Sequence, residues 1–87
     1  MALSFPNASR SWDASKQCVS FWGHDSMLEV AFEVEDQAIH LICPAALRNE
    51  ESLLKAFDVN RSRIEQIAGK VYGKRRGSWL RLSASDF

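Results

Sequence analysis

The sequence LEVAFEVE at residues 28–35 decides the fold. Large apolar residues occupy every second position, and glutamate or alanine stands between them. Because successive side chains of a β-strand point to opposite faces of a sheet, this alternation predicts a strand with one buried face and one face in water. The preceding sequence QCVSFW, residues 17–22, predicts a second strand. Turn-forming residues at 23–26 lie between the two, so we expect an antiparallel hairpin.

Helices are expected downstream of the hairpin, over its apolar face. Asp36 is a suitable N-cap for a short helix that ends before Pro44, and Asn49 can cap a second helix. Further along, apolar residues recur at the i, i+3, i+4 and i+7 spacing of an amphipathic third helix. The apolar stripes consist of Leu53, Leu54 and Phe57 in the second helix and of Ile64, Ile67, Ala68 and Val71 in the third.

Local signals predict the limits of the third helix. Ser62 and Glu65 fit the capping-box pattern, which favours a break after the second helix. Gly73 is expected at the C-terminal end. Gly69 lies inside the helix, where glycine is unfavourable, and it therefore indicates close approach to a neighbouring element.

The C-terminal segment predicts a further strand. Residues 79–84 alternate again, with Leu80 and Leu82 facing inward. The helices that precede this segment are long enough to cross the sheet. The last strand is therefore expected to add to the hairpin.

The N-terminal segment is expected at the edge of the sheet. Residues 3–5 predict a short edge strand, and the turn-rich residues 6–16 predict an ordered loop with Trp12 packed on the core. The expected fold class is α+β in a single domain over residues 1–87. It is a small, mostly antiparallel sheet, formed by the hairpin plus the C-terminal strand, packed on two to three helices.

Composition narrows the possible functions. The chain has 87 residues, of which 46% are hydrophobic, enough for one modest core. Its formal net charge is zero, which argues against a protein that is basic throughout. The charge is uneven, because residues 1–43 carry two basic and six acidic side chains and residues 44–87 carry nine and five. The halves either complement each other within the fold or a dimer, or present a basic face to an acidic partner.

The sequence shows neither a secretion signal nor a membrane span. The first residues lack the basic start and apolar run of a signal peptide. No window approaches about 18 consecutive apolar residues, as a membrane helix requires. Cys18 and Cys43 are expected to be free thiols in a reducing compartment. We therefore expect a cytoplasmic protein without membrane contact.

Residue pairs that could carry catalysis or bind a metal give only weak signals. His24 and Asp25 fall in the predicted turn, with no serine or cysteine nucleophile coupled to them. His40 and Cys43 lack the second ligand pair of a structural zinc site. The sequence therefore predicts no enzyme activity, no cofactor and no metal. The carboxylates expected on the solvated face of the 28–35 strand are Glu29, Glu33 and Glu35.

Basic and aromatic residues near the C-terminus predict an interaction surface. Cations engage phosphates and aromatic rings stack on bases, so a nucleic-acid site is one interpretation. A solvated helix end, with cations near the last carbonyls, is the other. Trp22 and Trp79 have outward parity, so they either form an exposed apolar patch or are buried by helices on both faces. The candidate interaction surface consists of Trp22, Lys70, Lys74, Arg75, Arg76, Trp79 and Arg81.

Short segments along the chain resemble a small bacterial family, the domain-of-unknown-function family numbered 1488. They are LSFPN at 3–7, SWD at 11–13, VSF at 19–21, the segment 29–39, and the segment 57–72 with RIEQIA at 63–68. The resemblance implies a compact α+β fold, a bacterial cytoplasmic setting and a stand-alone domain. It implies no activity and supplies no catalytic or binding residues.

These observations favour a non-catalytic protein-interaction or regulatory module. Its expected partner is another protein or a second copy of the chain. The alternative is a nucleic-acid-binding protein that uses the basic C-terminal residues, and its binding would weaken steeply with salt.

Overall fold

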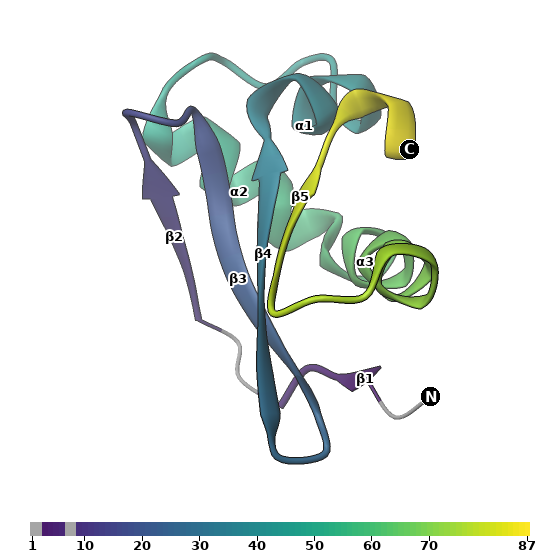
Figure 1. Ribbon diagram of the computed structural model, residues 1–87. Helices are drawn as coiled ribbons and strands as arrows, with labels where there is room; N and C mark the ends of the chain where they lie inside the picture. Colours follow the sequence, from purple (N-terminus) through teal and green to yellow (C-terminus); the bar gives the residue numbers. More distant parts are fainter. Residues whose placement is uncertain (1–2, 7–8) are drawn as a thin grey trace.

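The computed structural model describes residues 3–6 and 9–87, and shows a sheet with helices packed behind it (Figure 1). Over these residues the chain forms five strands, three α-helices and a final 3-10 turn. This is the α+β arrangement that the sequence predicts. In chain order the elements are β1 (Leu3–Ser4), β2 (Arg10–Asp13), β3 (Cys18–Asp25), β4 (Leu28–Glu35), α1 (Asp36–Ile42), α2 (Glu50–Val59), α3 (Arg61–Arg75), β5 (Trp79–Leu82) and η1 (Ala84–Asp86).

The sheet has the strand order β1-β3-β4-β5, and β2 also pairs with β3. The β3–β4 hairpin is antiparallel, with Phe21 opposite Phe32 and Trp22 opposite Ala31. β5 lies parallel to β4, with Trp79 opposite Ala31. The parallel direction follows because α1, α2 and α3 carry the chain back along the sheet before β5 begins. The predicted hairpin plus C-terminal strand is confirmed.

The N-terminal part of the sheet differs from the prediction. A loop was expected throughout residues 6–16, but Arg10–Asp13 forms strand β2, antiparallel to β3. The serines and aspartate of this segment have low strand propensity, and pairing with β3 outweighs that preference. Trp12 packs against the core as expected. Residues 7–8 of the expected loop lie outside the described residues.

The hairpin turn lies later in the chain than predicted. The sequence predicts a turn over residues 23–26, but only the last of these residues belongs to it. β3 continues through Gly23 to Asp25, and the connection consists of Ser26, with φ 57°, and Met27. Gly23 has a different role from the expected turn glycine, because β1 crosses close to it. A Cβ atom at Gly23 would lie 2.9 Å from a ring carbon of Phe5. The glycine therefore permits the approach of β1 rather than the turn.

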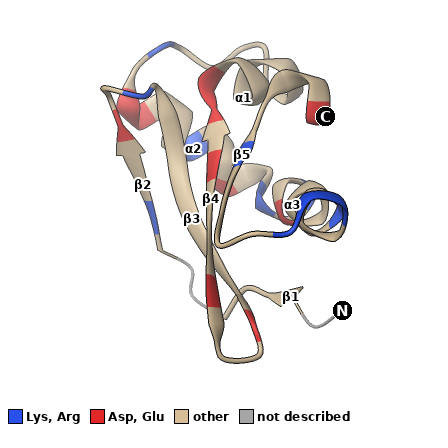
Figure 2. Ribbon diagram, in the orientation of Figure 1, with Lys and Arg blue, Asp and Glu red and all other residues tan. Residues whose placement is uncertain are grey.

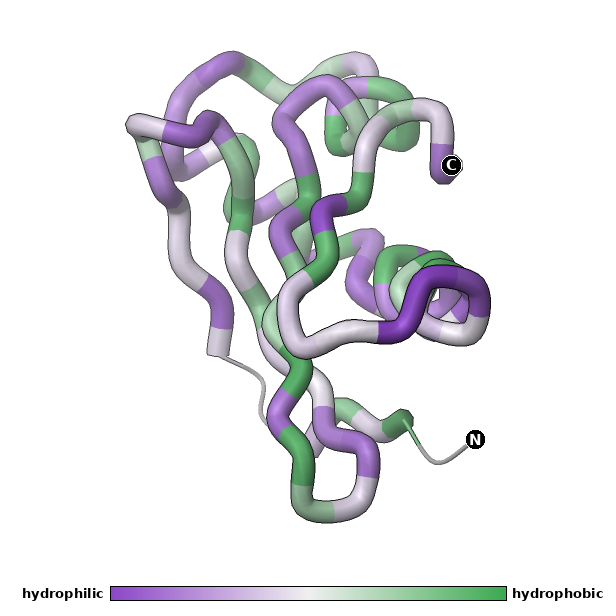
Figure 3. The backbone as a smooth tube through the Cα atoms, viewed as in Figure 1, coloured by the Kyte–Doolittle hydropathy of each residue, from purple (hydrophilic) through white to green (hydrophobic). Residues whose placement is uncertain are grey.

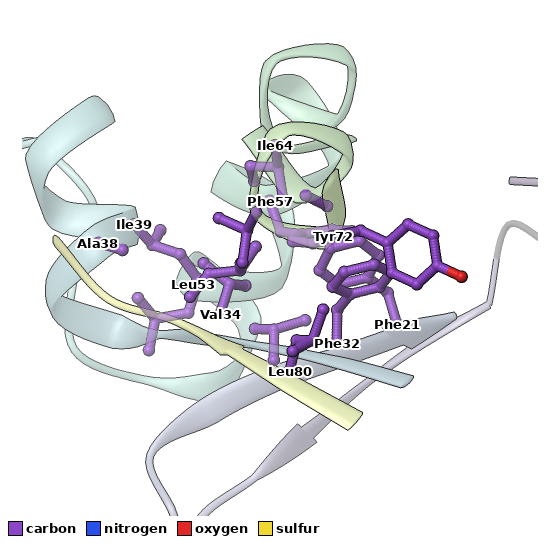
Figure 4. Close-up of a cluster of buried hydrophobic side chains, with 14 of the residues drawn as sticks. Phe21, Phe32, Val34, Ala38, Ile39, Leu53, Phe57, Ile64, Tyr72 and Leu80 are labelled. Atoms are coloured by element: carbon purple, nitrogen blue, oxygen red, sulfur yellow. The ribbon is translucent and has the colours of Figure 1, made fainter. Parts of the chain in front are cut away.

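The core lies between the sheet and the helices (Figure 4). Phe21 and Phe32 stack with ring centroids 5.2 Å apart, and Phe57 of α2 tilts against Phe21 at the same distance. Ile64 of α3 is fully buried. Burying each such side chain contributes about 1.5–3 kcal/mol. Hydrophobic and hydrophilic residues alternate along β4 (Figure 3), so the pleat supplies the sheet side of this core.

The predicted N-cap of α2 is confirmed, whereas that of α1 differs by one residue. Asn49 caps α2, and its Oδ1 accepts a hydrogen bond from the backbone N–H of Ser52 at 2.8 Å. Asp36 was expected to be the N-cap of α1, but Glu35 occupies that position and Asp36 is the first helical residue. β4 runs directly into α1, so the strand's last residue takes the extended N-cap conformation.

The limits of α3 differ from the prediction. The expected break between the second and third helices lies at Asn60, but the capping box does not form, because α3 begins at Arg61 and Ser62 is therefore inside the helix. Glu65 pairs instead with Arg61 at 2.9 Å. The helix continues through Gly73 to Arg75 and ends at Arg76, with φ 44°. A Cβ atom at Gly69 would meet nothing within 4 Å, so the expected close approach there was wrong.

Candidate interaction surface

In the part of the chain that the structure describes, helices cover only one face of the sheet. α1, α2 and α3 all lie on the same side of the sheet (Figure 1), so side chains of opposite parity point away from the core. We call this the open sheet face. Its central residues on β3, β4 and β5 are Ser20, Trp22, Ala31, Glu33, Trp79 and Arg81.

Two tryptophans lie in one row of the open sheet face. Trp22 is opposite Ala31, and Ala31 is opposite Trp79. Neighbouring strands are about 4.8 Å apart, so the Cα atoms of the two tryptophans are roughly 10 Å apart with a small side chain between them. Trp79 is 54% exposed and Trp22 is half-buried. Their predicted outward parity is confirmed, and helices do not cover both faces.

The next row of the open sheet face holds a network of ion pairs. Arg81 donates from Nε to Oε2 of Glu35 at 2.6 Å and from Nη1 to Oε1 of Glu33 at 3.1 Å. Its Nη2 also donates to the backbone carbonyl of Lys16 at 3.1 Å. The hydrogen bond with Glu35 raises the pKa of Arg81, so the guanidinium is a fixed cation.

This network corrects the expectation of a solvated carboxylate row. Glu33 is only 5% exposed, and its second oxygen accepts from Nζ of Lys16 at 3.3 Å. Glu35 is half-buried, and Glu29 is exposed as expected. Alternation predicted the correct face for these carboxylates but not their burial, because the covering cations come from other strands and loops.

Lys16 joins the network to the exposed tryptophan. Its ammonium group lies 5.6 Å from the centroid of the Trp79 ring, within range of a cation–π interaction. Cys18 is fully buried beneath the network, and burial raises the pKa of its thiol. A raised pKa leaves less of the reactive thiolate at neutral pH. The sequence alone carries no signal that Lys16 belongs to this face.

The predicted interaction residues separate into two groups. Trp22, Trp79 and Arg81 belong to the open sheet face. The others lie exposed at the C-terminal end of α3, where basic residues gather (Figure 2). This second group consists of Lys70, Lys74, Arg75 and Arg76.

Two arginines of the second group have internal partners. Arg75 forms an ion pair with Asp86 of η1 and donates from Nη1 to the backbone carbonyl of Arg81 at 3.3 Å. The guanidinium of Arg76 lies 5.2 Å from the centroid of the Tyr72 ring. Within residues 3–6 and 9–87, no ion pair involves Lys70 or Lys74.

In the two histidine-containing pairs of the sequence analysis, His24–Asp25 and His40–Cys43, one residue of each contacts groups of the protein itself. Asp25 accepts a 2.5 Å hydrogen bond from the Tyr72 hydroxyl, which raises the pKa of that phenol. His40 contacts two backbone carbonyls, Asp36 O at 3.0 Å from Nδ1 and Ala46 O at 2.9 Å from Nε2. It thereby joins α1 to the following loop. In the described part of the chain, no three histidine, cysteine or acidic side chains are placed to hold a metal ion.

No helix in the described ranges 3–6 and 9–87 combines the length and apolar character needed to cross a membrane.

A family model described as "Protein of unknown function (DUF1488)" matches residues 3–82. The fold is similar to the crystal structure of a protein of unknown function from this family, from Shewanella loihica PV-4. That match has a TM-score of 0.81 at 15% identity, and covers 93% of this chain and 91% of the other. No curated protein matches the sequence.

Proposed function

Because the chain belongs to the family described as "Protein of unknown function (DUF1488)", its relatives supply no activity, and we propose that it is a non-catalytic protein-interaction or regulatory module. The observation that carries the proposal is Trp79, 54% exposed in the row Trp22–Ala31–Trp79 of a sheet face without helices. Tryptophan and arginine are enriched at the energetic centres of protein interfaces.

The surroundings of Trp79 suit a preformed contact surface. Lys16 lies over its ring, and Arg81 is tied to Glu33 and Glu35 in the adjacent row. Side chains that are already ordered lose less conformational entropy when a partner binds. Apolar contact at the tryptophan row, with polar groups around it, is the usual anatomy of an interface.

The partner is another protein or a second copy of this chain. We place the protein in the bacterial cytoplasm, as the family resemblance implies. Both cysteines are free thiols, which suits a reducing compartment.

A pull-down from bacterial lysate, with and without nuclease, tests the proposal, together with light scattering of the purified protein. Trp79→Ala is expected to lower the amount of retained partner, or the amount of dimer, at least tenfold. Val59→Ala is the control, because Val59 is another exposed apolar residue, 76% exposed, and lies on α2, away from the open sheet face. A partner that both variants retain equally would contradict the use of the open sheet face.

Nucleic-acid binding is the second candidate function. Lys70 and Lys74 favour it, because they lie one helical turn apart, exposed and without a carboxylate. Such binding would weaken steeply as salt rises, and a Lys70→Glu/Lys74→Glu double variant would abolish it. Unchanged binding of RNA and DNA by that variant would exclude this site. A partner that survives nuclease favours the protein-interaction module instead.

A further inference from the structure

Among residues 3–6 and 9–87, no strand lies beside the edge of β4 next to the hairpin turn. β5 begins opposite Ala31, so residues 28–30 extend beyond its start. The N–H of Ala31 donates to the carbonyl of Ser78 at 2.8 Å, which shows the side to which its backbone groups point. Residues two apart in a strand point their backbone groups to the same side. Within the described residues, the N–H and C=O of Glu29 therefore face a position that no strand occupies.

A groove lies beside this open edge. Its volume is about 290 Å³, and its lining includes Leu28, Val30, Tyr72, Arg76 and Ser78. Val30 and Tyr72 are buried, whereas Leu28 is 67% exposed and forms an apolar rim. Sites for drug-sized ligands span about 300–1,000 Å³, so this groove suits one apolar side chain.

Arg76 lies at the groove with its charge available. Its guanidinium is held over the Tyr72 ring at 5.2 Å, and Tyr72 is anchored by its hydrogen bond to Asp25. No carboxylate among residues 3–6 and 9–87 forms an ion pair with Arg76. A guanidinium that is held in place and has no carboxylate partner within the protein can bind a carboxylate of another molecule, which matches it in geometry and charge.

The other long edge of the sheet near this point is protected. Because Ser78 O points to β4, the backbone groups of Arg81 point away from it. Arg75 donates to the carbonyl of Arg81, and the N–H of Ser83 donates to Asp86 at 2.8 Å. Side chains thus already bind backbone groups next to β5 that an added strand would need for its own hydrogen bonds. Natural proteins commonly protect their edge strands in such ways. No side chain of the described residues forms a comparable hydrogen bond with the backbone of β4 at residues 28–30.

We propose that an extended segment of a protein partner adds to β4 at Glu29, places an apolar side chain in the groove and sets a carboxylate on Arg76. The inference goes beyond the proposed function, because it assigns a second contact, at the edge of β4 and separate from the tryptophan row, and names the partner's chemistry. Backbone hydrogen bonds supply affinity in such strand addition, and the groove and arginine supply specificity.

Selection from a displayed library of random seven-residue peptides on the purified full chain tests this inference. Enriched peptides are expected to combine an apolar residue with an acidic residue. Synthetic labelled copies should bind Arg76→Glu at least tenfold more weakly than the wild type. Lys74→Glu is the matched control, since it makes the same charge change nearby on an exposed residue of α3.

Amide hydrogen exchange of the complex supplies the second measurement. The amide of Glu29 should exchange at least tenfold more slowly with peptide bound, whereas that of Ala31, already bonded to Ser78, should change little. The inference is overturned if no apolar-acidic pattern is enriched, if both charge variants bind alike, or if Glu29 is not protected. Failure here with a Trp79-dependent protein partner in the lysate would leave the proposed function standing.

Discussion

Arg81 on β5 and Glu35 on β4 are joined by a 2.6 Å hydrogen-bonded ion pair, although 46 residues separate them in sequence. The same guanidinium also holds Glu33, a carboxylate that is almost fully buried. The parallel pairing of the two strands thus provides both an exposed tryptophan and the ordered charges around it.

Removal of Arg81 should destabilise the protein. Arg81→Ala leaves Glu33 buried with Lys16 as its remaining partner, so we expect a loss of about 1–3 kcal/mol in the free energy of unfolding. Urea unfolding measures it, and Lys70→Ala is the control at an exposed lysine. A loss below about 0.5 kcal/mol, as for ordinary surface substitutions, would contradict the structural role of the network.

Tyr72 offers a direct titration, because it is the single tyrosine of the sequence. Its hydrogen bond to Asp25 raises its pKa, so the folded-state value lies above the unfolded one. The stabilisation is complete below the ordinary tyrosine pKa of about 10 and is lost as pH rises through the higher folded value.

Absorbance at alkaline pH should therefore show Tyr72 ionising later in the folded protein than after unfolding in urea. Asp25→Asn should move the folded value back toward the unfolded one. Identical titration of the wild type and Asp25→Asn would contradict the contact.

Two glycines should respond in opposite directions to alanine. Gly23→Ala places a Cβ 2.9 Å from Phe5 and 3.1 Å from the carbonyl of Ser4, so we expect a loss of about 1–3 kcal/mol. Gly69→Ala meets nothing and removes a helix-interior glycine, so we expect a gain of roughly 0.5–1 kcal/mol. Thermal unfolding of both variants checks the signs, and equal shifts would refute this assignment.

Stability should fall in acid partly through Asp58. Arg10 of β2 donates two 2.9 Å hydrogen bonds to this carboxylate on α2, and they lower its pKa. A lowered folded pKa gives stabilisation that is complete above the ordinary aspartate value of about 3.9 and is lost as pH falls through the folded value. In Asp58→Asn, the free energy of unfolding measured with urea should therefore fall less steeply as the pH drops below about 4. An unchanged acid slope would show that the pair does not contribute.

The sequence predicted those features that depend on local periodicity. The alternation in residues 28–35 identified β4 and its inner face, because the pleat itself imposes a period of two. The apolar spacing of residues 64–71 identified the buried stripe of α3 for the same kind of reason. The family resemblance also proved correct.

Features that depend on register between distant segments were not predictable in this way. The row of Trp22 and Trp79 requires the pairing of β4 with both β3 and β5. Lys16 reaches Glu33 and Trp79 from a turn, and no local pattern indicates such a contact. β2 was missed because pairing with β3 overrides the turn preference of its residues.

The late position of β5 in the chain has a consequence for the order of folding. The hairpin closes over a two-residue connection, whereas β5 must find β4 after the whole helical segment. Closing that long loop costs entropy before any contact rewards it, so we expect β5 to dock after the rate-limiting barrier. Leu82→Ala should then accelerate unfolding and leave the refolding rate nearly unchanged in stopped-flow experiments. A slowed refolding rate would mean instead that β5 is already paired with β4 in the folding nucleus.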